Sequence, residues 1–89
     1  MQFAIEFSTP ARDQQVVTDA IETRLTHEPD KPARNRKQLA DNRLAPWELR
    51  VGDFRVFYDI KVDRATVVIV AVGRKVHNRL IIGGEEIEL

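Results

Sequence analysis

The clearest alternation of apolar and polar side chains in this 89-residue chain lies between residues 47 and 60. The apolar positions of the two runs are Trp47, Leu49, Val51, Phe54, Val56 and Tyr58. A period of two is typical of strands that bury one face. Gly52 and Asp53 separate the runs and fit a two-residue turn, in which the glycine adopts a positive φ. The pattern predicts a hairpin that pairs Trp47 with Tyr58 and places Arg50 directly opposite Arg55.

Two helices are expected between the N-terminus and this hairpin. Thr9 and Pro10 fit the N-cap and first position of a helix with an apolar stripe, and Pro29 ends it near His27. After Pro32 a second, shorter and strongly basic helix is expected to run to about residue 40.

The remaining apolar positions predict further strands. Residues 2–7 alternate as a half-buried strand does, and residues 66–73 carry apolar side chains on both faces, as a central strand does. Residues 80–82 and 85–89 fit a small final hairpin. The fold expected is α+β: one N-terminal strand, two helices and a three-stranded antiparallel meander that completes a sheet packed on the helices, in a single domain of residues 1–89.

Composition narrows the possible classes of protein. The chain has no cysteine, and its 14 basic and 14 acidic side chains balance, so neither a disulfide framework nor bulk attraction to a polyanion is indicated. The longest apolar run, residues 67–72, is too short to span a bilayer, and no signal-peptide pattern is present, so a cytoplasmic protein without membrane contact is expected. Charge is unevenly placed: residues 31–55 carry seven basic and three acidic side chains.

The opposed arginines are the first candidate site. Like charges placed opposite each other across strands are unfavourable, so Arg50 and Arg55 call for a counter-charge, either Glu48 from within or an anionic ligand from outside. Neither His27 nor His77 forms a metal-ligand pattern with acidic neighbours, and no cofactor or metal is expected. A second basic group fits either a solvated face or an edge that contacts phosphate. Its members are Arg34, Arg36 and Lys37.

The stretch from Trp47 to Ile60 resembles the core signature of RelE/ParE-type toxins of bacterial type II toxin–antitoxin modules, as do residues 36–39 before it and residues 68–75 after it. The resemblance runs in continuous order over about residues 20–75 and is specific to the superfamily. It implies a cognate antitoxin as partner. In the RelE-like branch it implies ribosome-associated, metal-independent cleavage of mRNA by attack of a ribose 2′-hydroxyl on the adjacent phosphate. The alternatives are a ParE-like poison of DNA gyrase that cleaves nothing and a catalytically degraded member that only binds the antitoxin.

For the ribonuclease branch, the resemblance assigns catalytic cations to Arg50 and Arg55 in the hairpin and to Lys75 or Arg74 after the last core strand. The basic group of Arg34, Arg36 and Lys37 is the candidate RNA-binding group in this branch, with a solvated helix face as the alternative. We expect the arginines and Lys75 or Arg74 to meet on one concave surface.

Because of two departures from the RelE pattern, the resemblance does not identify the residues that transfer protons. Glu48 stands where RelE has a lysine, and no tyrosine follows Lys75. His77 is a candidate acid or base in place of the tyrosine. Glu48 is a candidate base or, with more weight, a plain counter-ion. On the sheet face opposite the core we expect Val67, Ile69, Ala71 and Phe57, where an antitoxin helix would dock.

Overall fold

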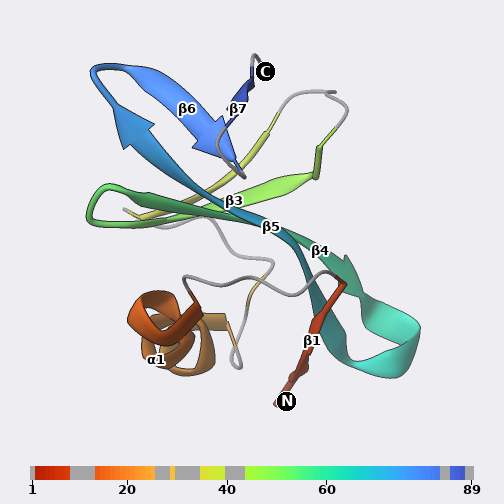
Figure 1. Cartoon of the computed structure of the whole chain (residues 1–89). Coiled ribbons are helices and arrows are strands. Elements are labelled where there is room, and N and C mark those ends of the chain that lie inside the picture. Colours follow the sequence, from red (N-terminus) through yellow and green to blue (C-terminus); the bar gives the residue numbers. More distant parts are fainter. Residues whose placement is uncertain are drawn as a thin grey trace.

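The computed structural model describes residues 2–8, 14–25, 29, 35–39, 44–82 and 85–87, with the side chains of residues 14–19 left aside. Its elements are β1 (Ala4–Phe7), α1 (Gln14–Leu25), β2 (Arg36–Gln38), β3 (Trp47–Val51), β4 (Phe54–Lys61), the 3₁₀ turn η1 (Val62–Arg64), β5 (Thr66–Val76), β6 (Arg79–Ile82) and β7 (Glu85–Ile87). The described strands form one seven-stranded sheet in the order β2-β3-β4-β5-β6-β7, with β1 parallel to β5. α1 lies on one side of this sheet, and the β6–β7 hairpin curls away from it at the far end (Figure 1).

The hairpin of β3 and β4 has the register that the sequence predicts. Trp47 pairs with Tyr58 and Arg50 with Arg55. Gly52 adopts a φ of 58° in the turn, a conformation open to glycine at no steric cost. The rings of Trp47 and Tyr58 stack with centroids 6.0 Å apart and planes inclined by 19°.

The main core lies between this hairpin, β5 and α1. Leu49, Val56 and Tyr58 from the hairpin pack with Ile21 and Leu25 of α1, and all five side chains are fully buried. The Tyr58 hydroxyl donates a hydrogen bond of 2.9 Å to the buried carbonyl of Pro29. The period-two pattern of the sequence thus corresponds to one sheet face, which α1 covers.

A β-bulge in β5 corrects the expected placement of Val67 and Ile69. Phe57 pairs with Ala71 but Tyr58 with Ile69, so Val70 is an extra residue in β5. One extra residue exchanges the faces of the side chains on either side of it. Val67 and Ile69 are therefore buried in the core beside α1, whereas Val70 and Ala71 join Phe57 on the opposite face.

The expected second helix is wrong over residues 36–38, which form strand β2. Arg36 pairs with Leu49 and Lys37 with Glu48, and backbone bonds from Arg50 N to Asn35 O and from Leu39 N to Pro46 O extend the ladder at both ends. The backbone of β3 gains hydrogen-bond partners this way, and that gain outweighs the intrinsic helix preference of Arg, Lys and Gln. The expected helix start at Thr9-Pro10 and its end near His27 lie outside the described residues.

The meander is longer than expected because β5 continues to Val76 and turns directly into β6. His77 and Asn78 form the two-residue turn with φ values of 50° and 67°, as tight hairpins require. The final hairpin is confirmed as β6–β7, with Leu80 paired to Ile87. β6 approaches β5 closely at buried Gly73, where a Cβ atom would lie 2.7 Å from Ile82 Cγ1.

Candidate functional site

An open pocket of about 1030 Å³ lies on the sheet face opposite α1. Its apolar base and walls belong to the smaller cluster of buried side chains on that face, which includes Phe57 and Leu80. Five cations line it, one from each of five consecutive strands of the sheet. These cations are Lys37, Arg50, Arg55, Lys75 and Arg79.

The period of the strands explains why these side chains meet. Glu48 and Arg50 alternate along β3 with the buried Trp47 and Leu49, so they project from the face that α1 does not cover. Three carboxylates share the lining with the cations, namely Glu48, Asp53 and Glu86. With histidine neutral, the lining carries a net charge of +2 from five cations and three carboxylates.

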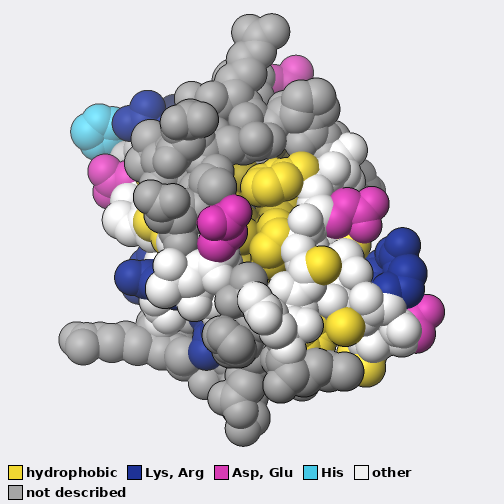
Figure 2. Space-filling view, turned by 90° about the horizontal axis from the view of Figure 1, so that it is seen from below, with side chains coloured by type: hydrophobic (Ala, Val, Ile, Leu, Met, Phe, Trp, Pro, Cys, Tyr) yellow, Lys and Arg dark blue, Asp and Glu magenta, His cyan; other side chains and the backbone are white. Residues whose placement is uncertain are grey.

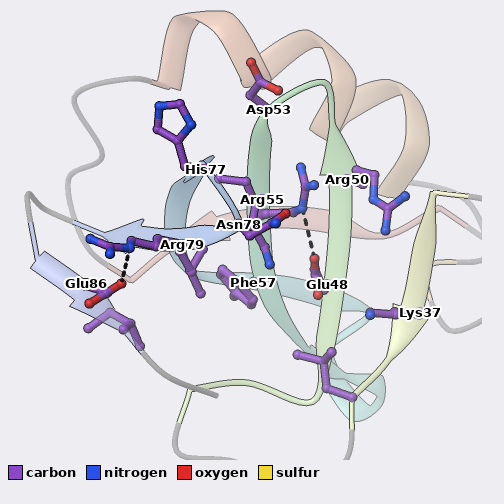
Figure 3. Close-up of a pocket in the computed structure, with 14 residues that line it drawn as sticks. Lys37, Glu48, Arg50, Asp53, Arg55, Phe57, His77, Asn78, Arg79 and Glu86 are labelled. Atoms are coloured by element: carbon purple, nitrogen blue, oxygen red, sulfur yellow. Dashed lines mark ion pairs between the residues drawn. The ribbon is translucent and has the colours of Figure 1, made fainter.

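Glu48 and Arg55 form an ion pair in the middle of the pocket (Figure 3). Arg55 Nε lies 3.3 Å from Glu48 Oε1, and the two side chains are 13% and 9% exposed. Glu48 is the one charged residue that is buried among the described residues. Arg55 Nη1 also donates hydrogen bonds to the carbonyls of Gly52 and Phe54, at 2.8 and 2.9 Å. The counter-charge that the opposed arginines require is therefore supplied from within.

Arg50, Lys75 and Lys37 are exposed and make no ion pair within the described part of the chain. Figure 3 shows Arg50 and Lys37 on one side of the central ion pair, with Arg79 and Glu86 on the other. Arg79 Nε lies 3.4 Å from Glu86 Oε1, but both side chains are more than half exposed. A pair so exposed is weak, so Arg79 keeps much of its capacity to bind an anion.

Two of the described basic residues assigned from the sequence, Arg74 and Arg36, do not line this pocket. The Arg74 guanidinium lies 5.5 Å from the centroid of the Phe54 ring, and Phe54 packs against the core beside α1. Arg36 Nη1 donates a 2.6 Å hydrogen bond to the carbonyl of Arg24 in the last turn of α1, and its buried Nε makes no hydrogen bond. Both side chains thus sit on the helix side of the sheet, because successive residues of a strand alternate faces. Arg34 lies outside the described residues.

The β5–β6 turn brings His77 and Asn78 to the pocket rim, where both are exposed. His77 is thereby placed near the cations, as expected of an acid or base candidate. Asn78, Arg79 and Glu86 also line the pocket but were not predicted from the sequence to do so. They come from this turn and from the hairpin after it. Asn78 was the available signal, since asparagine readily adopts the positive φ of a two-residue turn.

The described residues include no group of three or more His, Cys, Asp or Glu side chains that could hold a metal ion. Within the same ranges, no helix is long and apolar enough to cross a membrane. The arrangement on the open face is a set of cations around one buried ion pair, which suits binding of an anion.

Figure 2 shows the molecule from below relative to Figure 1, on a surface where the distribution of side-chain types differs from that of the pocket. Among the side chains drawn in colour there, hydrophobic ones gather near the middle, and Lys and Arg lie mostly toward the edges (Figure 2). Val62, which is 69% exposed, is the most exposed large hydrophobic side chain described. Of the ten Lys and Arg residues whose side chains are described, five line the pocket.

Comparison with protein-family models gives the class of protein, a toxin of the RelE/ParE superfamily. The family model described as "ParE toxin of type II toxin-antitoxin system, parDE" matches residues 3–78. The chain therefore belongs to the ParE toxin family, which implies a cognate antitoxin as its partner.

A solved structure shares the fold. The toxin–antitoxin complex RelBE2 from Mycobacterium tuberculosis contains a chain with a TM-score of 0.65 and 24% sequence identity. The match covers 83% of this chain and 92% of that one. The comparison with curated protein sequences found no match.

Proposed function

We propose that this toxin inhibits translation by cleaving mRNA on the ribosome, and that the open-face pocket is its RNA-binding and catalytic site. The observation that carries this proposal is the convergence of cations from five strands on one pocket. RNA carries a negative charge at each phosphate, and clustered Lys and Arg side chains are the usual means of binding it.

The chemistry of such a site needs a base, an acid and a cation. The base removes the proton from a ribose 2′-hydroxyl, whose oxygen then attacks the adjacent phosphorus atom. The bond from phosphorus to the 5′-oxygen breaks, and the acid gives that oxygen a proton. The products are a 2′,3′-cyclic phosphate and a free 5′-hydroxyl.

Arg50 and Lys75 are suited to stabilise the charge that develops on the phosphate oxygens, because both are exposed at the pocket and unpaired among the described residues. His77 is the rim residue suited to proton transfer. Glu48 fits the counter-ion role better than the base role, since Arg55 lies 3.3 Å from its carboxylate. A general base must reach the proton that it removes, and this carboxylate is already occupied and buried.

A second candidate function is poisoning of DNA gyrase through protein contacts, without cleavage of RNA. The Glu48–Arg55 pair favours it, because that pair neutralises the middle of the pocket where a nuclease would concentrate positive charge. The family description, which names the ParE toxin, favours the same reading. A third candidate is a catalytically degraded member that only binds its antitoxin, and the Glu48–Arg55 pair favours it for the same reason.

Induced expression in bacteria separates the two candidates. The nuclease predicts that incorporation of labelled methionine stops before DNA synthesis does, and that Arg50→Ala removes the arrest. Arg64→Ala is the matched control, because Arg64 is an exposed arginine of η1 outside the pocket and should stay toxic. Induction of the DNA-damage response with translation intact would overturn the nuclease and support the gyrase poison.

A further inference from the structure

Arg55 differs from the other cations of the pocket because its guanidinium is largely buried and bonded within the protein. Nε faces the Glu48 carboxylate at 3.3 Å, and Nη1 donates to the carbonyls of Gly52 and Phe54 at 2.8 and 2.9 Å. The side chain is 13% exposed. A guanidinium has five N–H donors in a rigid fork, so fixing two of its nitrogens fixes the whole group.

The turn that Arg55 holds is also bonded to β5. The backbone N–H of Lys75 donates a 2.8 Å hydrogen bond to the carbonyl of Asp53, the residue between Gly52 and Phe54. The carbonyls on either side of Asp53 are the two that Arg55 binds. The carbonyl that binds the Lys75 amide therefore lies between the two carbonyls that Arg55 binds.

We propose that Arg55 is a positioning residue that does not contact the ligand. Paired with Glu48, it braces the turn at residues 52–54 and, through the Asp53 carbonyl, holds the backbone of Lys75 at the pocket. The anion is then bound by Arg50 and Lys75. The identity of that anion as RNA rests on the proposed function. The brace, which consists of the contacts of Arg55 with Glu48 and with the turn at residues 52–54, does not.

Glu48 has a defined part in this brace. Arg55 stands opposite Arg50, and two uncompensated cations there would repel each other. Glu48 neutralises Arg55, which lowers the repulsion, and Arg50 keeps its charge for the ligand. A buried cation also needs a partner to offset the loss of its hydration.

Hydrogen exchange of single backbone amides tests the brace without any RNA. The variant Glu48→Leu/Arg55→Leu removes both charges and the bonds to the turn carbonyls, and keeps the net charge of the chain. We expect the Lys75 amide to exchange at least severalfold faster than in the wild type. The Leu39 amide, bonded to Pro46 O in another strand pair, is the control and should be unchanged. An unchanged rate at Lys75 would overturn the brace.

Arg55→Lys provides a second variant if the double substitution does not fold. It keeps a cation for Glu48 but replaces the two nitrogens that Arg55 uses, Nε for Glu48 and Nη1 for the carbonyls, with one nitrogen on a flexible stem, so the rigid fork is lost. The same acceleration at Lys75 is expected. Protection equal to the wild type would again contradict the brace.

The salt dependence of binding to a single-stranded RNA oligonucleotide tests whether Arg55 touches the ligand. Each phosphate contact contributes about −0.7 to the slope of log K against log salt concentration for single strands. The Glu48→Leu/Arg55→Leu variant should bind more weakly with the wild-type slope, whereas Arg50→Leu should make the slope about 0.7 less steep. Arg64→Leu is the control, because it removes one arginine that does not line the pocket.

A slope about 0.7 less steep in the double variant would overturn the positioning role and make Arg55 a ligand contact. If the wild type does not bind RNA at all, the proposed function fails, and the exchange rate of the Lys75 amide still decides for or against the brace.

Discussion

Arg50 and Arg55 occupy opposed positions on β3 and β4, yet their surroundings differ. Arg55 is largely buried against Glu48, whereas Arg50 is exposed at the pocket without an ion pair in the described ranges. The period-two pattern predicted the opposition of the two arginines correctly. It did not predict which arginine would form the ion pair with Glu48, because the pattern gives the sheet face of a side chain and not its rotamer.

At Glu48, substitution by glutamine separates the counter-ion from the base. Glu48→Gln removes one negative charge from the pocket, so binding of single-stranded RNA should be unchanged or stronger. Because Arg55 is left without a counter-charge, the free energy of unfolding should fall by about 1–3 kcal/mol. Binding and cleavage assays with denaturant unfolding check both effects. Loss of cleavage with binding intact would show that Glu48 is the base.

Gly73 has no side chain, and this allows β6, which carries part of the pocket wall, to pack closely against β5. An added Cβ would lie 2.7 Å from Ile82 Cγ1 and 2.8 Å from the Ile81 carbonyl. Gly73→Ala should therefore lower the free energy of unfolding by about 1–3 kcal/mol. Gly52→Asn is the control, since that position is open and asparagine tolerates its positive φ, and it should change the stability by less than about 0.5 kcal/mol. Equal stability of Gly73→Ala and the wild type would mean that β6 can move away from β5.

At the scale of elements, the β3–β4 hairpin was predictable because its signals are local. Its alternation and its Gly52 turn lie within fifteen residues and agree with each other. β2 was not predictable in this way, because its strand conformation depends on pairing with β3, which lies further along the chain. The bulge at Val70 left no mark in the sequence either, since its apolar neighbours suit both faces of the sheet.

The same limits apply to the candidate site. Arg50, Arg55 and either Lys75 or Arg74 were expected on one concave surface, and Arg50, Arg55 and Lys75 line the pocket. The candidate acid or base residues Glu48 and His77 line it too. The sequence left Lys75 and Arg74 as alternatives because the alternation of faces had to be counted through the bulge and the full length of β5. Arg79 and Glu86 were not predicted at the pocket because the two-residue turn between β5 and β6, at His77 and Asn78, lacks glycine, the residue that usually marks such turns.

The turn between β5 and β6 gives a prediction for this element. Asn78 has a φ of 67°, which an alanine adopts only at a cost of roughly 1–2 kcal/mol. Asn78→Ala should lower the melting temperature, whereas Asn78→Gly, which removes the same side chain but accepts this φ, should leave it nearly unchanged. If both variants melt together, the loss comes from the side-chain amide and not from the backbone conformation.

At the scale of the whole molecule, a chain of zero formal net charge holds a pocket of net positive charge. Local placement rather than composition therefore makes the pocket positively charged. The opposite face of the sheet is covered by α1, so the fold separates the structural core from the surface available for function.

Membership of the ParE toxin family gives a prediction about assembly. Co-expression with the neighbouring reading frame should yield a stable complex of the two proteins and should restore growth, because a cognate antitoxin neutralises its toxin. Size-exclusion chromatography with a tagged toxin checks this. A neighbour whose product never co-purifies and never restores growth would contradict that pairing.

The central claim is that the pocket cleaves RNA, and mapping the ends of the fragments tests it most directly. Purified toxin is added to ribosomes that carry a defined mRNA, and the fragment ends are identified chemically. We predict 2′,3′-cyclic phosphate and 5′-hydroxyl ends, with the rate lowered by about 100-fold or more in Arg50→Ala/Lys75→Ala and unchanged in Arg64→Ala. Intact mRNA, at toxin concentrations that stop growth of the host, would contradict the claim.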